Sequence, residues 1–320
     1  MNNTATLARS ITWASSKQSY IIAILLADKD LVDDCLRAYA YFRWADDVVD
    51  VFLHNVDERL VFIRRQKALV EKFYRDERSD DLSPEEEMLA DLIGHDRGTN
   101  SGLLSFIRNF MLVLEFDARR KGCLVDKHEL IMYSVCLGTA VMDGIQYFIG
   151  NGHQYPRIEG RCLAVSGAHI THMLRDMLND IPVGFINIPH EYLDMQGISA
   201  QDVTSEQFRA WVRERVELAR HFFREGKRYI DGLEVLRCKL AGFWYCARFE
   251  HVLDAIECDG YQLRAEYNEC RKLAVWMEMA WLGVAVTLKH FAQRIRRAFP
   301  RLKPRIALSS DVNLRSYHLE

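Results

Sequence analysis

Apolar residues recur every three to four positions along most of the chain, from Tyr20 to His290. This period matches one face of an α-helix, and the alternation typical of β-strands is scarce. The pattern therefore predicts an all-α protein built as a helical bundle. We expect its inter-helical loops where the pattern breaks, at residues 76–87, 94–102, 150–160 and 181–189.

Composition supports a chain with one substantial core. The 320 residues are 49% hydrophobic and include only 17 glycines and 6 prolines, which excludes disordered and collagen-like classes. No repeat of about 20 to 50 residues occurs, so residues 1–290 are predicted to form a single domain. The formal charge of −3 provides no basic field for DNA or RNA, and we expect no nucleic-acid partner.

The end of the chain differs from the rest. Residues 291–320 are predicted to be a basic, loosely ordered tail, which could contact an anionic membrane surface peripherally. No signal peptide pattern begins the sequence, and its eight cysteines form no C-x-x-C motif, so a cytoplasmic location is expected. Basic residues without any acid among them mark the change: Lys289, Arg294, Arg296, Arg297, Arg301, Lys303 and Arg305.

A first acidic stripe lies in the segment Arg43-Trp-Ala-Asp46-Asp47-Val-Val-Asp50, which has apolar neighbours on nearly every side. At about 100° per residue, Arg43, Asp46 and Asp50 fall within an arc of about 60° on a helix. Carboxylates on a buried helix need cations or hydrogen-bond donors. Pairing of Arg43 with Asp46 or Asp47 on a more exposed helix is the alternative.

A second stripe favours a joint site. His169, His172, Asp176 and Asp180 are spaced by three, four and four residues, which places them within about 80° of one helical face. Two carboxylates four residues apart on each of two apolar helices could face each other. Such a pair would hold hard divalent ions with positions open for ligand oxygens, which suits Mg²⁺ and a diphosphate.

These segments resemble the paired aspartate motifs of the squalene/phytoene synthase family. The first motif is Tyr39-Ala-Tyr-Phe-Arg-Trp-Ala-Asp-Asp-Val-Val-Asp50 and the second is Leu174-Arg-Asp-Met-Leu-Asn-Asp180. The likeness extends over roughly residues 15–288. Weaker matches are Ser16–Tyr20, Phe116–Asp117, Tyr133 before Gly138-Thr139, Gly184–Pro189 and Val252–Tyr261.

The resemblance implies the isoprenoid-synthase helical bundle around a central apolar cavity. It implies three Mg²⁺ ions that link the aspartates to an allylic prenyl diphosphate donor, with Arg43 and Arg175 as diphosphate-binding residues. Tyr133 carries over as a group near the reacting carbon. The implied metal ligands are Asp46, Asp50, Asp176 and Asp180.

The chain departs from the family around the second motif. Gln and Asn are usual where this chain has His169 and His172, and Arg and Tyr where it has Phe185 and Asn187. Imidazole is a poorer Mg²⁺ ligand than an amide oxygen, and it can accept a proton near neutral pH. His172, relayed by His169, is therefore a candidate catalytic base, with a purely structural histidine as the alternative.

The implied activity is head-to-head condensation of two fifteen- or twenty-carbon prenyl diphosphates. The sequence does not imply NADPH: no G-x-G-x-x-G fingerprint indicates a nicotinamide domain, but the family does not need one, so this absence decides nothing. The runner-up keeps the donor but transfers the prenyl group to a non-isoprenoid aromatic acceptor, with His172 as base. His169, His172, Phe185 and Asn187 are the residues that support it.

Two readings from other classes stay open at this point. His169, His172 and Asp176 could ligate a redox di-metal centre, although such bundles generally use Glu-x-x-His pairs, and none occurs in the sequence. A non-catalytic helical interaction module would leave both acidic stripes without a role.

Overall fold

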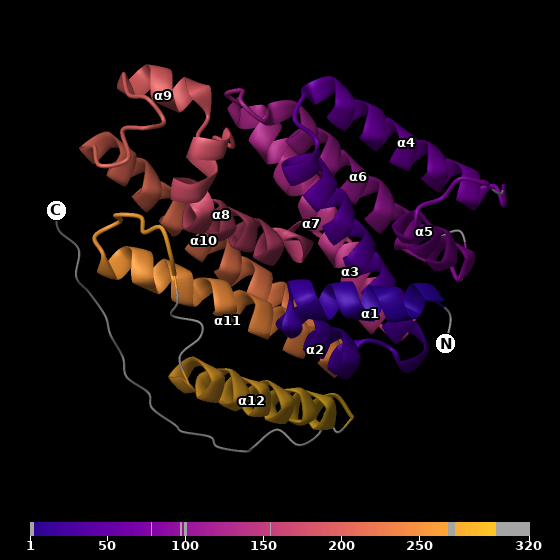
Figure 1. The fold of residues 1–320 in the computed structure, drawn as a ribbon. Helices are drawn as coiled ribbons and strands as arrows, with labels where there is room; N and C mark the ends of the chain where they lie inside the picture. Colours follow the sequence, from indigo (N-terminus) through magenta and orange to yellow (C-terminus); the bar gives the residue numbers. More distant parts are fainter. Residues whose placement is uncertain are drawn as a thin grey trace, which may run out of the picture.

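A computed structural model describes residues 3–77, 79–96, 98, 101–153, 155–267 and 273–298. Within these ranges the protein forms twelve α-helices and no β-strand, which confirms the predicted all-α class (Figure 1). No helix in the described ranges combines the length and the apolarity needed to cross a bilayer. The helices are α1 (Asn3–Ser15), α2 (Lys17–Leu26), α3 (Val32–Asp47), α4 (Val56–Tyr74), α5 (Pro84–Gly94), α6 (Leu103–Arg120), α7 (Lys127–Ile149), α8 (Leu163–Asp180), α9 (His190–Gln196), α10 (Glu206–Gly232), α11 (Leu236–Cys258) and α12 (Leu273–Ala298).

Local sequence signals begin several of these helices. Ser83 and Asp126 each form a capping box at the start of α5 and α7, with Glu86 and Glu129 returning a hydrogen bond to the cap. Such reciprocal bonds satisfy backbone groups that a helix end leaves unpaired. The predicted loops at 94–102, 150–160 and 181–189 all contain an inter-helical connection, and α5 begins inside the predicted break at 76–87.

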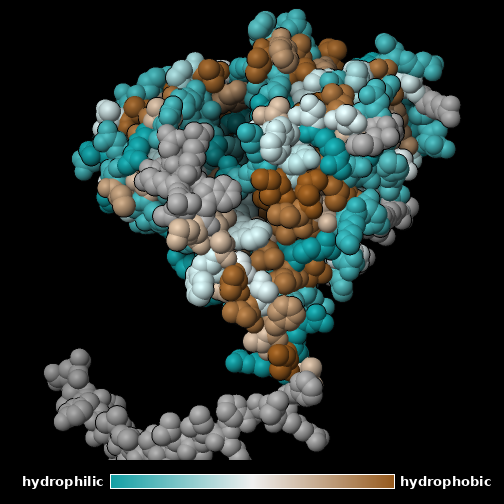
Figure 2. Space-filling view, turned by 60° about the horizontal axis from the view of Figure 1, so that its bottom comes forward, coloured by the Kyte–Doolittle hydropathy of each residue, from teal (hydrophilic) through white to brown (hydrophobic). Residues whose placement is uncertain are grey.

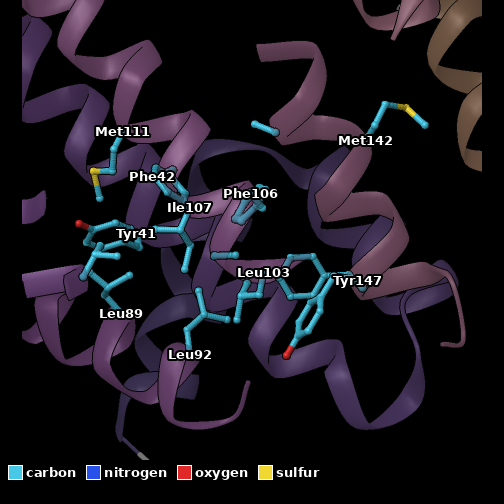
Figure 3. Close-up of a cluster of buried hydrophobic side chains, with 14 of the residues drawn as sticks. Tyr41, Phe42, Leu89, Leu92, Leu103, Phe106, Ile107, Met111, Met142 and Tyr147 are labelled. Atoms are coloured by element: carbon cyan, nitrogen blue, oxygen red, sulfur yellow. The ribbon is translucent and has the colours of Figure 1, made fainter. Parts of the chain in front are cut away.

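Two large clusters of buried apolar side chains hold the bundle together. One lies among α3, α5, α6 and α7, where Tyr41, Leu92, Leu103 and Ile107 are buried against one another (Figure 3). The Tyr41 hydroxyl donates to Gln66 Oε1 at 2.9 Å, so burying this polar atom costs little. The other cluster joins α8, α10 and α11. The two clusters position α3 and α8, the helices that carry the acidic stripes.

The last described helix extends past the boundary predicted at residue 290. α12 continues to Ala298, so residues 291–298, assigned to a loose tail from the sequence, are helical. Their Ala, Gln and Arg residues favour a helix in spite of the positive charge. The rest of the predicted tail, 299–320, lies outside the described residues.

Candidate functional site

A cavity of about 620 Å³ lies between α3, α6, α7 and α8. On α3, α6 and α7, its walls differ between an apolar and a polar end of the helix. On α6, Phe106, Phe110 and Leu114 come first, and Asp117 and Arg120 follow one and two turns later. α7 shows the reverse order, from Tyr133 to Phe148. The cavity therefore has one acidic and basic end and one apolar end.

The apolar end is closed by aromatic side chains. The rings of Phe106 and Phe148 meet edge to face with centroids 5.9 Å apart. Gly144 leaves room for them, because a Cβ there would lie 2.8 Å from the Phe106 ring. Phe106 and Asp117 are eleven positions apart on one helix, about 16 Å at the usual helical rise. This depth suits a long, apolar ligand with its charged group at the acidic end.

The first aspartate motif ends in an irregular turn. α3 stops at Asp47 and continues as a π-helical turn over Val48–Phe52, in which the Leu53 amide donates to the Val48 carbonyl at 3.1 Å. Three β-branched valines in this turn reduce the preference for a regular α-helix. The regular helix expected through Asp50 is therefore wrong beyond Asp47. π-turns occur frequently at functional sites.

The carboxylates of this motif are crowded by negative charge. Burial, reinforced by Asp50 and Asp117, raises the pKa of Asp46 to about 7. Burial and Asp117 likewise raise the pKa of Asp50 to about 6. Arg43 Nε lies 3.1 Å from Asp47, and Arg43 Nη1 lies 3.4 Å from Asp46, so the pairing considered from the sequence is present. It is directed mainly at Asp47 and leaves Asp46 poorly neutralised.

α8 places the second motif on one face, as its spacing predicts. Asp176 receives two hydrogen bonds of 2.6 Å from Arg175 and lies 2.8 Å from His172 Nε2. Although burial opposes this, these hydrogen bonds hold the pKa of Asp176 well below its usual range. Asp180 is one turn further on, and burial together with Asp176 raises its pKa to about 6.

The two histidines of α8 have different surroundings. His169 is buried, and its Nδ1 lies 2.9 Å from Ser134 Oγ. Burial, with His172 and Arg120 nearby, lowers the pKa of His169 to about 3, so this imidazole is neutral near pH 7. The side chain of His172 is 54% exposed and lies beside Asp176. His172 is thus the more accessible of the two.

A buried ion pair on α6 is the part of the site that the sequence analysis missed. Arg120 Nε donates to Asp117 at 2.7 Å, and the Tyr133 hydroxyl donates to the other Asp117 oxygen at 3.0 Å. Burial raises the pKa of Asp117, while Arg120 opposes that rise. The i,i+3 spacing of Asp117 and Arg120 on an apolar helix was the available signal.

Two residues that depart from the family pattern enclose Arg120. Its guanidinium lies 5.0 Å from the centroid of the Phe185 ring and hydrogen-bonds Asn187 Oδ1. The loop that carries both is held by Gly184, whose carbonyl accepts from the Gly122 amide at 2.8 Å. Gly184 has a φ of +95°, and a Cβ would lie 2.9 Å from the Gly122 nitrogen, so glycine is required there.

The donor set fits Mg²⁺, provided that ligand oxygens complete the coordination. Among the described residues no three acidic, imidazole or thiol groups converge closely enough to hold an ion by themselves. Asp50 Oδ1 is buried without a hydrogen-bond partner in the described ranges, which is costly unless a cation meets it. Carboxylates from two helices with open positions between them suit an ion bound jointly with a diphosphate.

Most of the predicted site residues meet at this cavity. Asp50 and Arg175 are not among its lining side chains, but Asp50 interacts electrostatically with Asp180, and Arg175 is bound to Asp176. The structure therefore brings both aspartate motifs to one end of one cavity. The predicted residues that line it are Arg43, Asp46, Tyr133, His169, His172, Asp176 and Asp180.

Known proteins resemble this chain in sequence and in fold. A 15-cis-phytoene synthase of Synechocystis is 28% identical over 163 residues, which cover 49% of this chain and 48% of that protein, so the match spans about half of the relative. The fold is similar to a squalene synthase from Alicyclobacillus acidocaldarius, with a TM-score of 0.65 and 18% identity over 82% of this chain and 95% of that one. A dehydrosqualene synthase gives a TM-score of 0.66 and 16% identity over 89% and 95% of the two chains.

The sequence model of squalene/phytoene synthases matches residues 14–275, a range that includes every predicted metal ligand and both histidines. With both motifs, the cavity between them and the fold in agreement, this chain belongs to the squalene/phytoene synthase family.

Proposed function

We propose that this protein is a Mg²⁺-dependent prenyltransferase that ionises an allylic prenyl diphosphate and couples the carbocation to a second prenyl diphosphate. The observation that carries the proposal is the cavity with carboxylates from α3 and α8 at one end and aromatic walls at the other. A prenyl diphosphate has the same division into a charged head and an apolar chain.

The aspartates Asp46, Asp50, Asp176 and Asp180 would hold the ions against the diphosphate. When bound, Mg²⁺ supplies positive charge to the oxygens of the departing diphosphate. Arg175 keeps Asp176 ionised and in place through its two hydrogen bonds. Asp176 is thus held in place before the reaction starts, so it requires little reorganisation as charge develops.

The rest of the cavity would protect the carbocation. Phe42, Phe106 and Phe110 contact one another along the cavity, and their ring faces can stabilise a cation without reacting with it. Burial and Asp117 raise the pKa of Tyr133 well above its usual value, so its hydroxyl stays protonated and donates to Asp117. Tyr133 is therefore held as a neutral group and not as a nucleophile.

The head-to-head reaction is preferred to transfer onto an aromatic acceptor. Phe185 and Asn187 support the latter reading from sequence, but in the structure both are engaged with Arg120. His169 is held by Ser134. These contacts explain why the chain has different residues from the family at these positions, and they require no change of acceptor. His172 stays a predicted base, and the predicted cytoplasmic location stays a prediction.

The proposal is tested by incubating the protein with Mg²⁺ and prenyl diphosphates of ten, fifteen and twenty carbons, and by measuring pyrophosphate release and product masses. Asp180→Asn should reduce release by a factor on the order of 100 or more, because it removes a metal ligand while preserving shape. Asp194→Asn, whose side chain is exposed on α9, is the matched control and should behave as wild type.

Release at the wild-type rate by Asp180→Asn would contradict the metal assignment. A wild type that releases pyrophosphate but forms only the prenyl alcohol from every chain length would leave the ionisation in place and refute the second prenyl diphosphate as acceptor.

We further propose that α12 rests on an anionic membrane surface. Long prenyl substrates and products partition into such a membrane. Six large apolar side chains, spaced by four and three residues, are exposed along one side of α12, and Figure 2 shows apolar residues gathered on the face of the molecule where α12 lies. Basic groups near the end of the helix complement anionic lipid headgroups. The exposed side chains are Met277, Trp281, Val284, Leu288, Phe291 and Ile295, and the basic ones are Arg294, Arg296 and Arg297.

Sedimentation with phosphatidylglycerol vesicles tests this contact. Trp281→Ser together with Leu288→Ser should abolish co-sedimentation, whereas Leu112→Ser, at an exposed position on α6, should not. Binding by the double variant at the wild-type level would refute the proposal. If light scattering shows that the wild type is a dimer and that the double variant is a monomer, the exposed side of α12 binds a second copy of the chain instead.

A further inference from the structure

A second cavity lies next to the first, between α7, α8 and α10. Its volume is about 410 Å³, within the range of small-molecule sites. Met173 and Asn187 belong to the walls of both cavities, and Ser134, which lines this one, is bonded to His169, which lines the other. We call this second cavity the α10 groove. The reaction proposed above does not use it.

The walls of the α10 groove are largely apolar. Ile131 and Val135 of α7 contribute apolar side chains that are about half exposed to solvent. Apolar surface left in water along a groove is a favourable place for an apolar chain to bind, because binding removes that surface from water. The apolar side chains that line it include Leu130, Ile131, Val135, Ile170, Leu218 and Phe222.

The α10 groove also contains a cation that forms no ion pair with any of the described residues. Arg215 Nε is buried and has no hydrogen-bond partner in the described ranges, and no carboxylate there lies within ion-pair distance of its guanidinium. Burial lowers the pKa of Arg215, and the charge of Glu214 opposes that lowering only in part. Its guanidinium lies 6.0 Å from the Trp211 ring, and Lys127 adds a second positive charge to the lining.

A buried guanidinium nitrogen without an acceptor is costly, and an anion that accepts its hydrogen bond would recover that loss. Glu214, the neighbouring acid, is exposed; its charge acts on Arg215, but the two form no ion pair within the described ranges. A ligand that complements this groove therefore has a negatively charged hydrogen-bond acceptor joined to an apolar body.

We propose that the α10 groove binds an amphipathic anion, a molecule whose apolar chain lies between α7 and α10 and whose carboxylate or phosphate meets Arg215 and Lys127. This site is separate from the aspartate motifs and requires no Mg²⁺. Because Met173 and Asn187 are shared, a ligand in the α10 groove touches the wall of the reaction cavity. The site goes beyond the prenyltransferase proposal and does not depend on it.

The test uses calorimetric titration of the full chain in EDTA with dodecyl phosphate and, separately, dodecanoate. Both should bind at least tenfold more tightly than dodecanol or inorganic phosphate, since each control lacks one half of the ligand. Whichever of the two anions binds more tightly indicates whether the natural ligand carries a phosphate or a carboxylate. Arg215→Gln should weaken binding at least tenfold, while Arg213→Gln, an exposed arginine on the same helix that stacks on Tyr261, should not change it.

Two further variants complete the test. Leu218→Trp keeps the charge and fills the groove, so it should also reduce binding at least tenfold, and circular dichroism checks that each variant is folded. Val141→Trp, which fills the reaction cavity and leaves the lining of the α10 groove unchanged, should bind the probe as wild type does.

Absence of binding to wild type, or wild-type binding by both folded Arg215→Gln and Leu218→Trp, would overturn the proposal. Loss of binding in folded Val141→Trp would place the probe in the reaction cavity and overturn it as well. Pyrophosphate release by wild type with Mg²⁺ is measured independently, so failure of the prenyltransferase proposal is distinguishable from failure of this one.

Discussion

Replacing Asp46 by Asn should stabilise the metal-free protein while abolishing its response to Mg²⁺. The structural reason is the crowding of Asp46 by burial and by Asp50 and Asp117, which raises its pKa from 3.8 to about 7. A shift of this size corresponds to roughly 4 kcal/mol of unfavourable interaction for the ionised form. Because the Asp46 side chain is 41% exposed, solvent screening reduces this to about 1 kcal/mol.

The pH dependence of the free energy of unfolding determines whether the substitution stabilises or destabilises the protein. The folded state binds a proton at Asp46 more tightly than the unfolded state does, so this group lowers the free energy of unfolding as pH rises from about 4 to about 7. The destabilisation is complete above that window and absent below it. Asp46→Asn should therefore melt about 2 °C higher than wild type at about pH 8, and the gain should vanish at about pH 4.

Thermal melts by circular dichroism in EDTA measure this difference, with Asp80→Asn, an exposed aspartate between α4 and α5, as the control. A second set of melts with Mg²⁺ and pyrophosphate should raise the melting temperature of wild type and leave that of Asp46→Asn unchanged. If Asp46→Asn melts below wild type at about pH 8, the carboxylate is a structural partner of Arg43, and the argument from charge crowding is refuted.

Three other outcomes are expected. Arg120→Met should lower the free energy of unfolding by about 3 kcal/mol because it leaves Asp117 buried and unpaired, and Asp117→Asn in the same chain should restore most of the loss in denaturant titrations; additive effects would contradict the pairing. Phe148→Ala opens the apolar end of the cavity, so product masses should shift toward longer donors, and an unchanged preference would show that this end does not limit chain length. His172→Asn removes the 2.8 Å contact with Asp176 and the predicted base, so coupling should fall while pyrophosphate release persists with prenyl alcohol as product; coupling at the wild-type rate would show that His172 is not the base.

The sequence predicted well what depends on regular helices. The spacing of His172, Asp176 and Asp180 places them on one face only if the helix is regular, and α8 is regular through Asp180. The apolar period also predicted the helices of the core, because burial of one helix face requires apolar residues at regular spacing along the sequence.

What the sequence did not predict depends on contacts between distant segments. Arg120 is held by Asp117 on its own helix but also by Phe185 and Asn187, more than sixty residues away. No local pattern encodes that contact, because the loop conformation that produces it depends on the approach of Gly184 to Gly122. The α10 groove was missed for the same reason, since its cation and its apolar walls come from three helices.

Because of the π-helical turn at Val48–Phe52, the position of Asp50 depends on the number of residues in this segment as well as on their identity. Deletion of Val48 or Val49 would allow an uninterrupted α-helix, which is the better hydrogen-bonded structure. The same deletion would rotate Asp50 by about 100° relative to Asp46. A selection for heat resistance alone would therefore accept the shorter chain and lose the ion site, so alignments used to engineer this protein should keep the number of residues here fixed.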